Sequence, residues 1–420
     1  MSSTVRSSPS LWEKAGLFFA SIAPGIFLIG YNIGTGSITT MAATGAAYGM
    51  VLVWPLLLSC IFTFFLIIAF GRYTAVTGET ALYSYRQHFG KGVALFVLVA
   101  LVLSEFASSM GVFAVVTQIV QEWSRPLTAS GNGFDPVVMT LFFGAILYAL
   151  FWNGHYRFFE KVLAVFVGLM GLSFLLTMFM VIPDPGEVLA GLVPRLPADS
   201  NAALLIAGMA GTTMGGVLYV VRSIQVKEKG WGPGELKLER RDAFVSALLM
   251  FLLSVAIMAC AAGTLYPHGL RVENAIDMVN LLEPLAGRFA ISIFVAGIVA
   301  AGLSSLFPII ILAPWLLADY QNEHANLQSP RNRGIALFVL LLGLVVPVFG
   351  GRPVLVMITS QAMLTIATPV IIGLMLVLLN RKSVMGDHTL GLGSNLILGI
   401  ILLFSLLMAG IGVMGLLGLG

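Results

Sequence analysis

The sequence predicts an all-α polytopic membrane protein with about eleven transmembrane helices. Of its 420 residues, 58% are hydrophobic and only 10% are charged, and the mean hydropathy is +0.98. Soluble domains carry about 25% charged residues, so this composition excludes a soluble globular protein. Apolar stretches of roughly 20 residues, the length that crosses a bilayer, recur from one end of the chain to the other.

The membrane spans are placed by breaking the apolar stretches at glycine, proline and clusters of charge. They lie near residues 16–45, 50–71, 92–121, 135–153, 158–182, 201–226, 242–265, 288–318, 334–349, 354–380 and 392–418. Residues 1–15 then form an N-terminal tail, residues 16–182 hold the first five spans, residues 201–380 hold the next five, and residues 392–418 form an additional span. The tail lacks the pattern of a cleavable signal peptide, so we expect the first span to stay in the mature protein.

The positive charges predict the orientation of the chain. Most Lys and Arg residues fall in loops that lie inside when the N-terminus is cytoplasmic, in agreement with the positive-inside rule. Only five of the 22 fall in outside loops: Arg125, Arg195, Arg271, Arg288 and Arg352. We therefore expect a multi-pass protein of the plasma (inner) membrane with a cytoplasmic N-terminus and an outside C-terminus. The charges serve topology, and no nucleic-acid partner is expected.

Two spans are interrupted by small and polar residues at mid-membrane depth. Residues 30–37 of the first span read GYNIGTGS, and residues 208–216 of the sixth read GMAGTTMGG. The two spans are five apart, so they cross the membrane in opposite directions, and spans one to five and six to ten can form an inverted repeat. Non-helical backbone is tolerated at this depth only where it is buried or lines a cavity. We predict that the broken helices 1 and 6 form a substrate site; the alternative is that their glycines only allow close packing.

The residue types at the two breaks favour an anion. Unpaired N–H groups at a helix start carry a partial positive charge, and hydroxyls add donors without adding negative charge, as in phosphate-binding loops. No metal site is predicted: the five histidines lie in loops or at span ends, and only Met214 remains at the breaks as a soft ligand. The substrate-binding candidates are Gly34, Thr35, Gly36, Ser37, Thr212, Thr213, Gly215 and Gly216.

Two charged residues within the spans are candidates for an ion or proton pathway. Glu105 is the only carboxylate deep inside a predicted span, where an ionisable residue is a functional candidate; the alternative is a satisfied interhelical hydrogen bond. Arg222 lies near the cytoplasmic end of the sixth span. It either snorkels to the interface or attracts anions to an inner vestibule.

Several segments resemble the Nramp family of proton-coupled divalent-metal transporters. They are Ala23-Pro24-Gly25 at the entry of the first span, residues 300–305 (AAGLSS) in the eighth, and Ser360-Gln361 followed by Pro369 in the tenth. The resemblance covers nearly the whole chain and implies the fold of the sodium-coupled amino-acid transporters. No nucleophile elbow, phosphate loop or HExxH pattern is present, so we expect no enzymatic activity and no catalytic residue.

The chain departs from this family at the metal site. Nramp metal sites are built from Asp-Pro-Gly-Asn in the first span and Met-Pro-His in the sixth, where this sequence has residues 33–36 and 214–216. Of the family's acidic pair in the third span, one position matches Glu105 and the other is Ser108. A divalent cation needs carboxylates to offset its lost hydration. One branch of Nramp-related proteins with a Gly-rich replacement is associated with bicarbonate uptake, and the resemblance to it implies the same here.

We therefore expect a secondary active transporter of a small oxyanion, with bicarbonate as the best candidate. Uptake of an anion against about 100 mV costs about 2.3 kcal/mol per charge, so cotransport is required. The fold superfamily implies a sodium site formed by Ser304 and Ser305 with carbonyls near Gly30 and Ile33, and we expect Na⁺ as the coupling ion and no other cofactor. The alternative is that the serine pair bonds back to its own helix.

Two other functions stay open. One is a proton-coupled transporter of Mg²⁺, Mn²⁺ or Fe²⁺, and the other is a non-transporting receptor on a transporter fold. In each case the expected partners are a small inorganic ion and the lipid bilayer. We expect the chain to act as a monomer or weak oligomer.

Overall fold

The computed structural model describes residues 34–153, 156–181, 185–197, 200–281 and 283–418, and the regular structure within these ranges is helical. The long helices and their continuations are α3 (Thr35–Tyr48), α4 (Val53–Thr77), α6 (Lys91–Ser124), α7 (Pro136–Asn153), α8 (Tyr156–Val181), α10 (Ser200–Met214), α11 (Gly216–Glu228), α12 (Leu236–Thr264), α13 (Glu283–Gln321), α14 (Pro330–Leu342), α15 (Val345–Phe349), α16 (Pro353–Asn380) and α18 (Leu392–Leu417). In this part of the chain, nine helical segments are long and apolar enough to cross a membrane. With α3 and α8 they occupy the positions of the eleven predicted spans, which confirms the all-α polytopic fold class.

The helices differ from the predicted spans in two respects. Three short helices, α5 (Ala81–Phe89), α9 (Pro185–Ala190) and α17 (Lys382–Met385), occupy segments expected as loops. The ninth span is divided into α14 and α15 just after Gly343, where a Cβ atom would lie 2.3 Å from the ring of Phe113. The close approach of α6 therefore requires glycine at this position. Residues 16–33 of the predicted first span, with the tail before them, lie outside the described residues.

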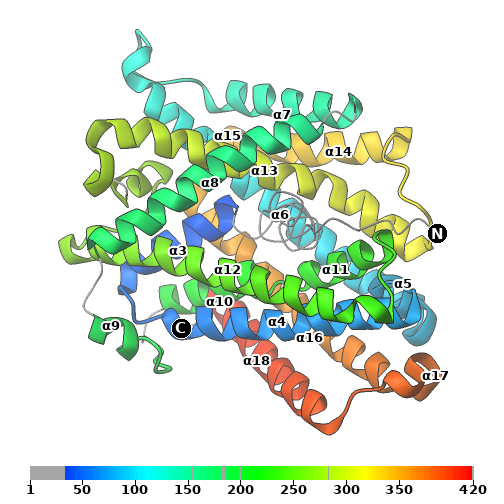
Figure 1. The fold of residues 1–420 in the computed structure, drawn as a ribbon. Coiled ribbons are helices and arrows are strands. Elements are labelled where there is room, and N and C mark those ends of the chain that lie inside the picture. Colours follow the sequence, from blue (N-terminus) through cyan, green and yellow to red (C-terminus); the bar gives the residue numbers. More distant parts are fainter. Residues whose placement is uncertain (1–33, 154–155, 182–184, 198–199, 282, 419–420) are drawn as a thin grey trace, which may run out of the picture.

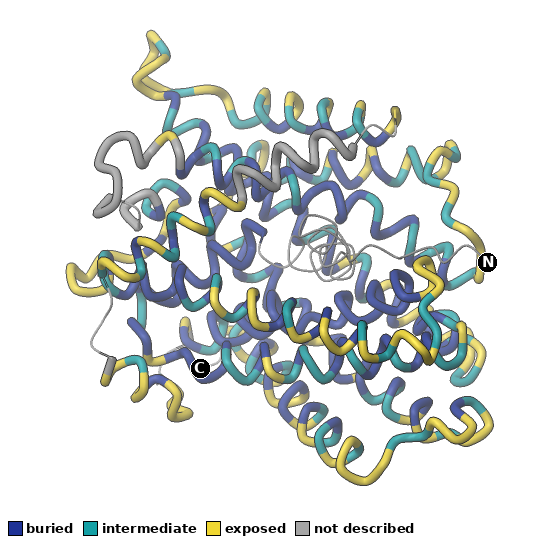
Figure 2. The backbone as a smooth tube through the Cα atoms, in the orientation of Figure 1, coloured by how far each residue is buried: buried dark blue, intermediate teal, exposed yellow. Residues whose placement is uncertain are grey.

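The broken helices lie inside the bundle (Figure 1). Helix α3 packs against α12 and α16, and α10 packs against α16, α4 and α18. Figure 2 shows buried backbone through the middle of the bundle and exposed residues along its outer helices and at its ends. The outer side of α18 exposes Leu396, Leu403 and Leu407. Such exposed leucines are the expected lipid-facing surface of a transmembrane helix.

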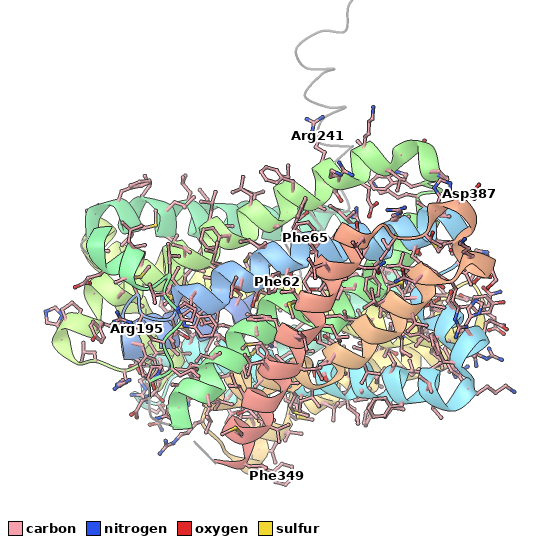
Figure 3. The ribbon with its side chains drawn as sticks, turned by 90° about the horizontal axis from the view of Figure 1, so that it is seen from below. Phe62, Phe65, Arg195, Arg241, Phe349 and Asp387 are labelled. Carbon is pink, nitrogen blue, oxygen red and sulfur yellow. The ribbon has the colours of Figure 1, made fainter. Side chains whose placement is uncertain are left out.

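Aromatic side chains fix the outer helix α18 to α4. The rings of Phe62 and Phe404 meet edge to face with their centroids 5.0 Å apart, a geometry that contributes about 0.5–1.5 kcal/mol beyond burial. Figure 3 shows Phe62 and Phe65 on α4 beside α18, with Arg195 and Asp387 toward opposite ends of the bundle. The charged residues thus mark the two ends, and the apolar belt lies between them.

A buried ion pair joins α11 to α12. The Arg222 side chain is fully buried, and its Nη1 donates a hydrogen bond of 2.5 Å to Oδ2 of Asp242. Glu239 Oε1 lies 3.8 Å from Arg222 Nε, and the Trp231 ring lies 5.5 Å from the guanidinium carbon. Gly71 on α4 leaves the space that the Glu239 carboxylate occupies. The guanidinium group therefore joins α11 to α12, and α4 packs closely against this pair at Gly71.

Replacement of Asp242 by alanine should destabilise the fold strongly. Removing one partner of a buried pair leaves a buried charge uncompensated, which costs about 3–5 kcal/mol. We expect Asp242→Ala to lower the thermal unfolding temperature of the detergent-solubilised protein markedly. The matched control is Glu122→Ala, which breaks the ion pair with Arg125, an exposed pair of the kind that contributes about 0–1 kcal/mol. Equal melting temperatures for the two variants would contradict this role.

Candidate functional site

A central cavity lies where the two breaks meet. It is small, with a volume of about 30 Å³, and six helices contribute to its walls: α3, α6, α10, α11, α13 and α16. The described residues that line it are Gly34, Gly36, Ser37, Glu105, Ser108, Val112, Gly211, Thr212, Gly215, Val217, Ser305, Ile309, Met357, Gln361 and Leu364. The lining thus combines glycines, hydroxyls, one amide and one carboxylate with five apolar side chains, and none of these residues is basic.

The start of α3 lies at the cavity, and the first N–H groups of this helix have no partner within the helix itself. Gly34 is extended and precedes the helix, and no side-chain hydrogen bond caps this end. The hydroxyls of Thr35 and Ser37 are buried without a hydrogen-bond partner among the described residues. The first N–H groups of a helix have no intrahelical partner and carry the positive end of the helix dipole. This end of the cavity is therefore suited to a negatively charged group.

The second break, between α10 and α11, is more fully satisfied. Gly215 interrupts the helix with extended backbone (φ −64°, ψ 136°). The N–H of Gly216 donates to Oγ1 of Thr368 at 2.9 Å, and the N–H of Leu218 donates to the carbonyl of Gly215. Thr213 bonds back to the Met209 carbonyl, and its own carbonyl accepts from Thr63. We expected unpaired N–H groups at both helix starts, but the first N–H group of α11 is already hydrogen-bonded to Thr368.

The structure brings five of the eight substrate-binding candidates to the cavity wall. These are Gly34, Gly36, Ser37, Thr212 and Gly215. Three candidates are placed elsewhere: Thr213 and Gly216 make the hydrogen bonds just described, and Thr35 packs beside α13, where a Cβ atom at Gly302 would lie 3.2 Å from the Thr35 hydroxyl. These three residues are not among the described residues that line the cavity, and their role in substrate binding stays a prediction.

The glycines of the breaks serve close packing as well as the cavity. A Cβ atom at Gly211 would overlap the Gln361 carbonyl, and one at Gly36 would lie 2.6 Å from the Met357 methyl group. Both contacts bring a broken helix onto α16. The packing alternative is thus part of the explanation, although it does not account for the unpartnered hydroxyls of Thr35 and Ser37.

The opposite wall holds residues that sequence reasoning did not assign to the site. Gln361 Nε2 donates to the Ser108 hydroxyl and to the Ser360 hydroxyl, each at 3.4 Å, so the amide is held between α6 and α16. Met357 lies between Gly36 and Gly111, with its sulfur 2.8 Å from the position of a Gly111 Cβ. A polar glutamine within an apolar span could have indicated that Gln361 faces a site. Nothing in the local sequence distinguished Met357 from other apolar residues of the span.

The cavity does not contain the ligand set of a metal site. No group of three or more His, Cys, Asp or Glu residues that could hold a metal was found in the described ranges. Glu105 on α6 is buried and lines the cavity, as the sequence suggested. The thioether in the lining comes from Met357, whereas Met214, the expected soft ligand, is not among the lining residues.

The predicted sodium site is only partly described. Ser305 is buried and lines the cavity. Both serine hydroxyls donate to the Ala301 carbonyl, Ser304 at 2.9 Å and Ser305 at 2.8 Å, which is the back-bonded alternative. Each hydroxyl oxygen still has lone pairs for a cation. Gly30 and Ile33, the other half of the predicted site, lie outside the described residues.

Arg222 does not line the central cavity. Its guanidinium group is held by Asp242 in the buried pair described above, so the structure supports neither a snorkelling side chain nor an exposed inner attractor for anions. Full burial and a carboxylate partner on α12 explain the difference. The sequence alone did not show that partner, which lies 20 residues away on the next span.

Comparisons with known proteins agree with this architecture. The family model described as natural resistance-associated macrophage protein-like (Nramp) matches residues 25–415. The divalent metal cation transporter MntH of Deinococcus radiodurans is 29% identical over 235 residues, covering 54% of this chain and 52% of that protein. The chain thus matches about half the length of that relative. MntH of Chromohalobacter salexigens is 24% identical over 96% of this chain and 94% of its own length.

Solved structures share the fold at lower sequence identity. A variant of the Eremococcus coleocola manganese transporter has a TM-score of 0.73 and 14% identity, covering 98% of this chain and 90% of that one. A nucleobase-cation-symport-1 family transporter has a TM-score of 0.54 and 16% identity, with 94% and 90% covered. Because the family model spans nearly the whole chain, this protein belongs to the Nramp family of multi-pass membrane transporters and is not an enzyme.

Proposed function

We propose that this Nramp-family transporter carries a small oxyanion, with bicarbonate as the preferred substrate. The observation that supports the proposal is the start of α3, where the buried hydroxyls of Thr35 and Ser37 have no hydrogen-bond partner among the described residues. This helix start lies at a cavity whose described lining contains hydroxyls, an amide and a single carboxylate. Helix-start N–H groups and the Ser37 hydroxyl donate to an anion. Gly34, which directly precedes α3, has no side chain to shield the backbone from a small ion.

A second candidate is a divalent cation such as Mg²⁺, Mn²⁺ or Fe²⁺, and family membership supports it. The relatives named above are described as divalent metal cation and manganese transporters. Glu105 and Met357 would be its ligands in the cavity. A single carboxylate and one packed thioether offer little compensation for the dehydration of a divalent ion. We therefore place the anion first.

Transport by the purified protein distinguishes these candidates. In proteoliposomes with an imposed inward ion gradient, we expect accumulation of labelled bicarbonate that empty liposomes do not show, and no accumulation of Mn²⁺ or Fe²⁺. Robust uptake of either metal, without bicarbonate uptake, would establish the cation transporter. The absence of any flux would favour the non-transporting receptor.

Substitution of Ser37 tests the position of the anion. A carboxylate about 4 Å from a bound anion costs on the order of 4 kcal/mol at an effective dielectric of about 20, which corresponds to roughly a thousandfold loss of affinity. We expect Ser37→Asp to abolish bicarbonate uptake, whereas the nearly isosteric but neutral Ser37→Asn retains most of it. Ser37 is preferable to Gly215, where a Cβ would lie 2.6 Å from the Gly211 carbonyl oxygen and disturb the backbone.

The uptake of bicarbonate and the uptake of a divalent cation should change in opposite directions between Ser37→Asn and Ser37→Asp. An added carboxylate strengthens a cation site and weakens an anion site. Equal bicarbonate affinity in Ser37→Asp and Ser37→Asn would place the anion elsewhere, and a gain of Mn²⁺ uptake in Ser37→Asp alone would favour the second candidate.

Sodium is proposed as the coupling ion. Thr35 packs beside Gly302, one turn before Ser305 on α13, so the start of α3 and the serine pair are neighbours. We expect replacement of external sodium by potassium or choline at fixed pH to abolish uphill bicarbonate uptake. Ser305→Ala should raise the sodium concentration needed for half-maximal uptake. Ser304→Ala should do so less, because Ser304 is absent from the described cavity lining.

Proton coupling through Glu105 is the alternative to sodium. Glu105 lines the central cavity, and an ionisable side chain at membrane depth is a candidate for proton transfer. If uptake continues without sodium, follows an imposed pH gradient and is lost in Glu105→Gln, the sodium proposal is wrong and Glu105 is the coupling residue.

A further inference from the structure

A second cavity lies along the same helices as the central one. This outer vestibule has an empty volume of about 930 Å³ and is bounded by Ala43 and Ala47 on α3, Leu204 on α10 and Val354 on α16. The central cavity uses the same three helices about one to two turns further along, at Gly36, Gly211 and Met357. The charge distribution predicts that the vestibule end of these helices faces outside.

A thin layer of side chains separates the two cavities. A Cβ atom at Gly208 on α10 would lie 3.2 Å from the Thr40 methyl group and 3.2 Å from Cγ2 of Ile358. Thr40 follows Ser37 of the central cavity by three residues, about 4.5 Å of rise along the helix. Ile358, which also lines the vestibule, follows Met357 directly. The vestibule therefore leads toward the central cavity, with Thr40, Gly208 and Ile358 between them.

Two arginines line this vestibule. Arg271 Nη1 donates to the Ala47 carbonyl at 3.2 Å, and its guanidinium carbon lies 5.9 Å from the centroid of the Tyr48 ring. Arg352 lies just before α16 and is exposed. Glu273 is also in the lining, but the ion pairs found in the described part of the chain involve Arg125 and Arg222 instead. The charged lining thus has an excess of one positive charge.

Basic residues are rare in the predicted outside loops, so the presence of two arginines at this vestibule is notable. Only five Lys and Arg residues fall in the predicted outside loops, and two of them meet at this one cavity. Arg195 lies near the same end of the bundle, since its carbonyl accepts from Trp54 near the start of α4, yet it does not line the vestibule. Like charges in a recess raise the local concentration of oppositely charged ions.

We propose that Arg271 and Arg352 form an outer collecting site for a small monovalent oxyanion, upstream of the central cavity. The inference rests on the proposed anion substrate and deepens it. The two guanidinium groups concentrate the anion above the layer formed by Thr40, Gly208 and Ile358, and the anion then moves to the start of α3. Because the vestibule is open to water, salt screens this attraction over about 8 Å at physiological ionic strength.

The test is the concentration dependence of labelled bicarbonate uptake by cells expressing the protein. We expect Arg352→Gln and Arg271→Gln to raise KM, and the double variant to raise it by about threefold to tenfold, with the maximal rate retained. Arg352→Lys should keep the parental KM because it keeps the charge. The control Arg195→Gln removes an arginine outside the vestibule and should leave KM unchanged. Added salt should raise KM of the parent more than that of the double variant.

The outcomes separate this inference from the proposed function. The collecting site is overturned if the double variant keeps the parental KM while the separate Ser37→Asp variant abolishes uptake. This result would leave the anion substrate in place. A loss of maximal rate that Arg352→Lys does not restore would show a structural role and also overturn it. If the protein instead takes up Mn²⁺ with a lower KM in the double variant, the anion substrate itself is wrong.

Discussion

The structure depends on one constraint: backbone polar groups at membrane depth must be satisfied or enclosed by protein. The breaks beside Gly34 and at Gly215 leave such groups in the middle of two spans. Helices α6, α13 and α16 enclose them, and the enclosure produces the central cavity. Thr368 satisfies one freed N–H of α11, whereas no side chain in the described part of the protein is found to cap the start of α3. Among the described residues, the polar groups without a partner therefore lie at the α3 end of the cavity and not at the α11 end.

The substrate is decided by the walls of this cavity and not by the fold. The chain shares its architecture with a manganese transporter at 14% identity, and a fold can host sites of different chemistry. Divalent ions need charged oxygen ligands, whereas small anions need donors and little negative charge nearby. Among the described lining residues, donors are frequent and Glu105 is the sole carboxylate. Arg271 and Arg352 in the outer vestibule likewise favour an anion over a cation.

Much of the fold was predictable because membrane spans are local features of a sequence. The apolar stretches, the break at Gly215 and the cavity positions of Ser37 and Thr212 follow from composition and from small residues at the middle of a span. The wall contributed by α16 was not predictable, because Met357 and Gln361 reach the site only through packing between distant spans. Arg222 shows the same limit, since its partner Asp242 lies on another helix. The short helix α5 was missed because nine residues between two spans have no membrane periodicity to identify them.

The most direct measurement is an experimental density map of the central cavity with bicarbonate present. A planar trigonal species within hydrogen-bond distance of the α3 start and the Ser37 hydroxyl is the predicted result. It should be absent from the Ser37→Asp protein under the same conditions. A spherical ion with octahedral or tetrahedral neighbours, including the Glu105 carboxylate and the Met357 sulfur, would contradict the anion site and establish a metal site in its place.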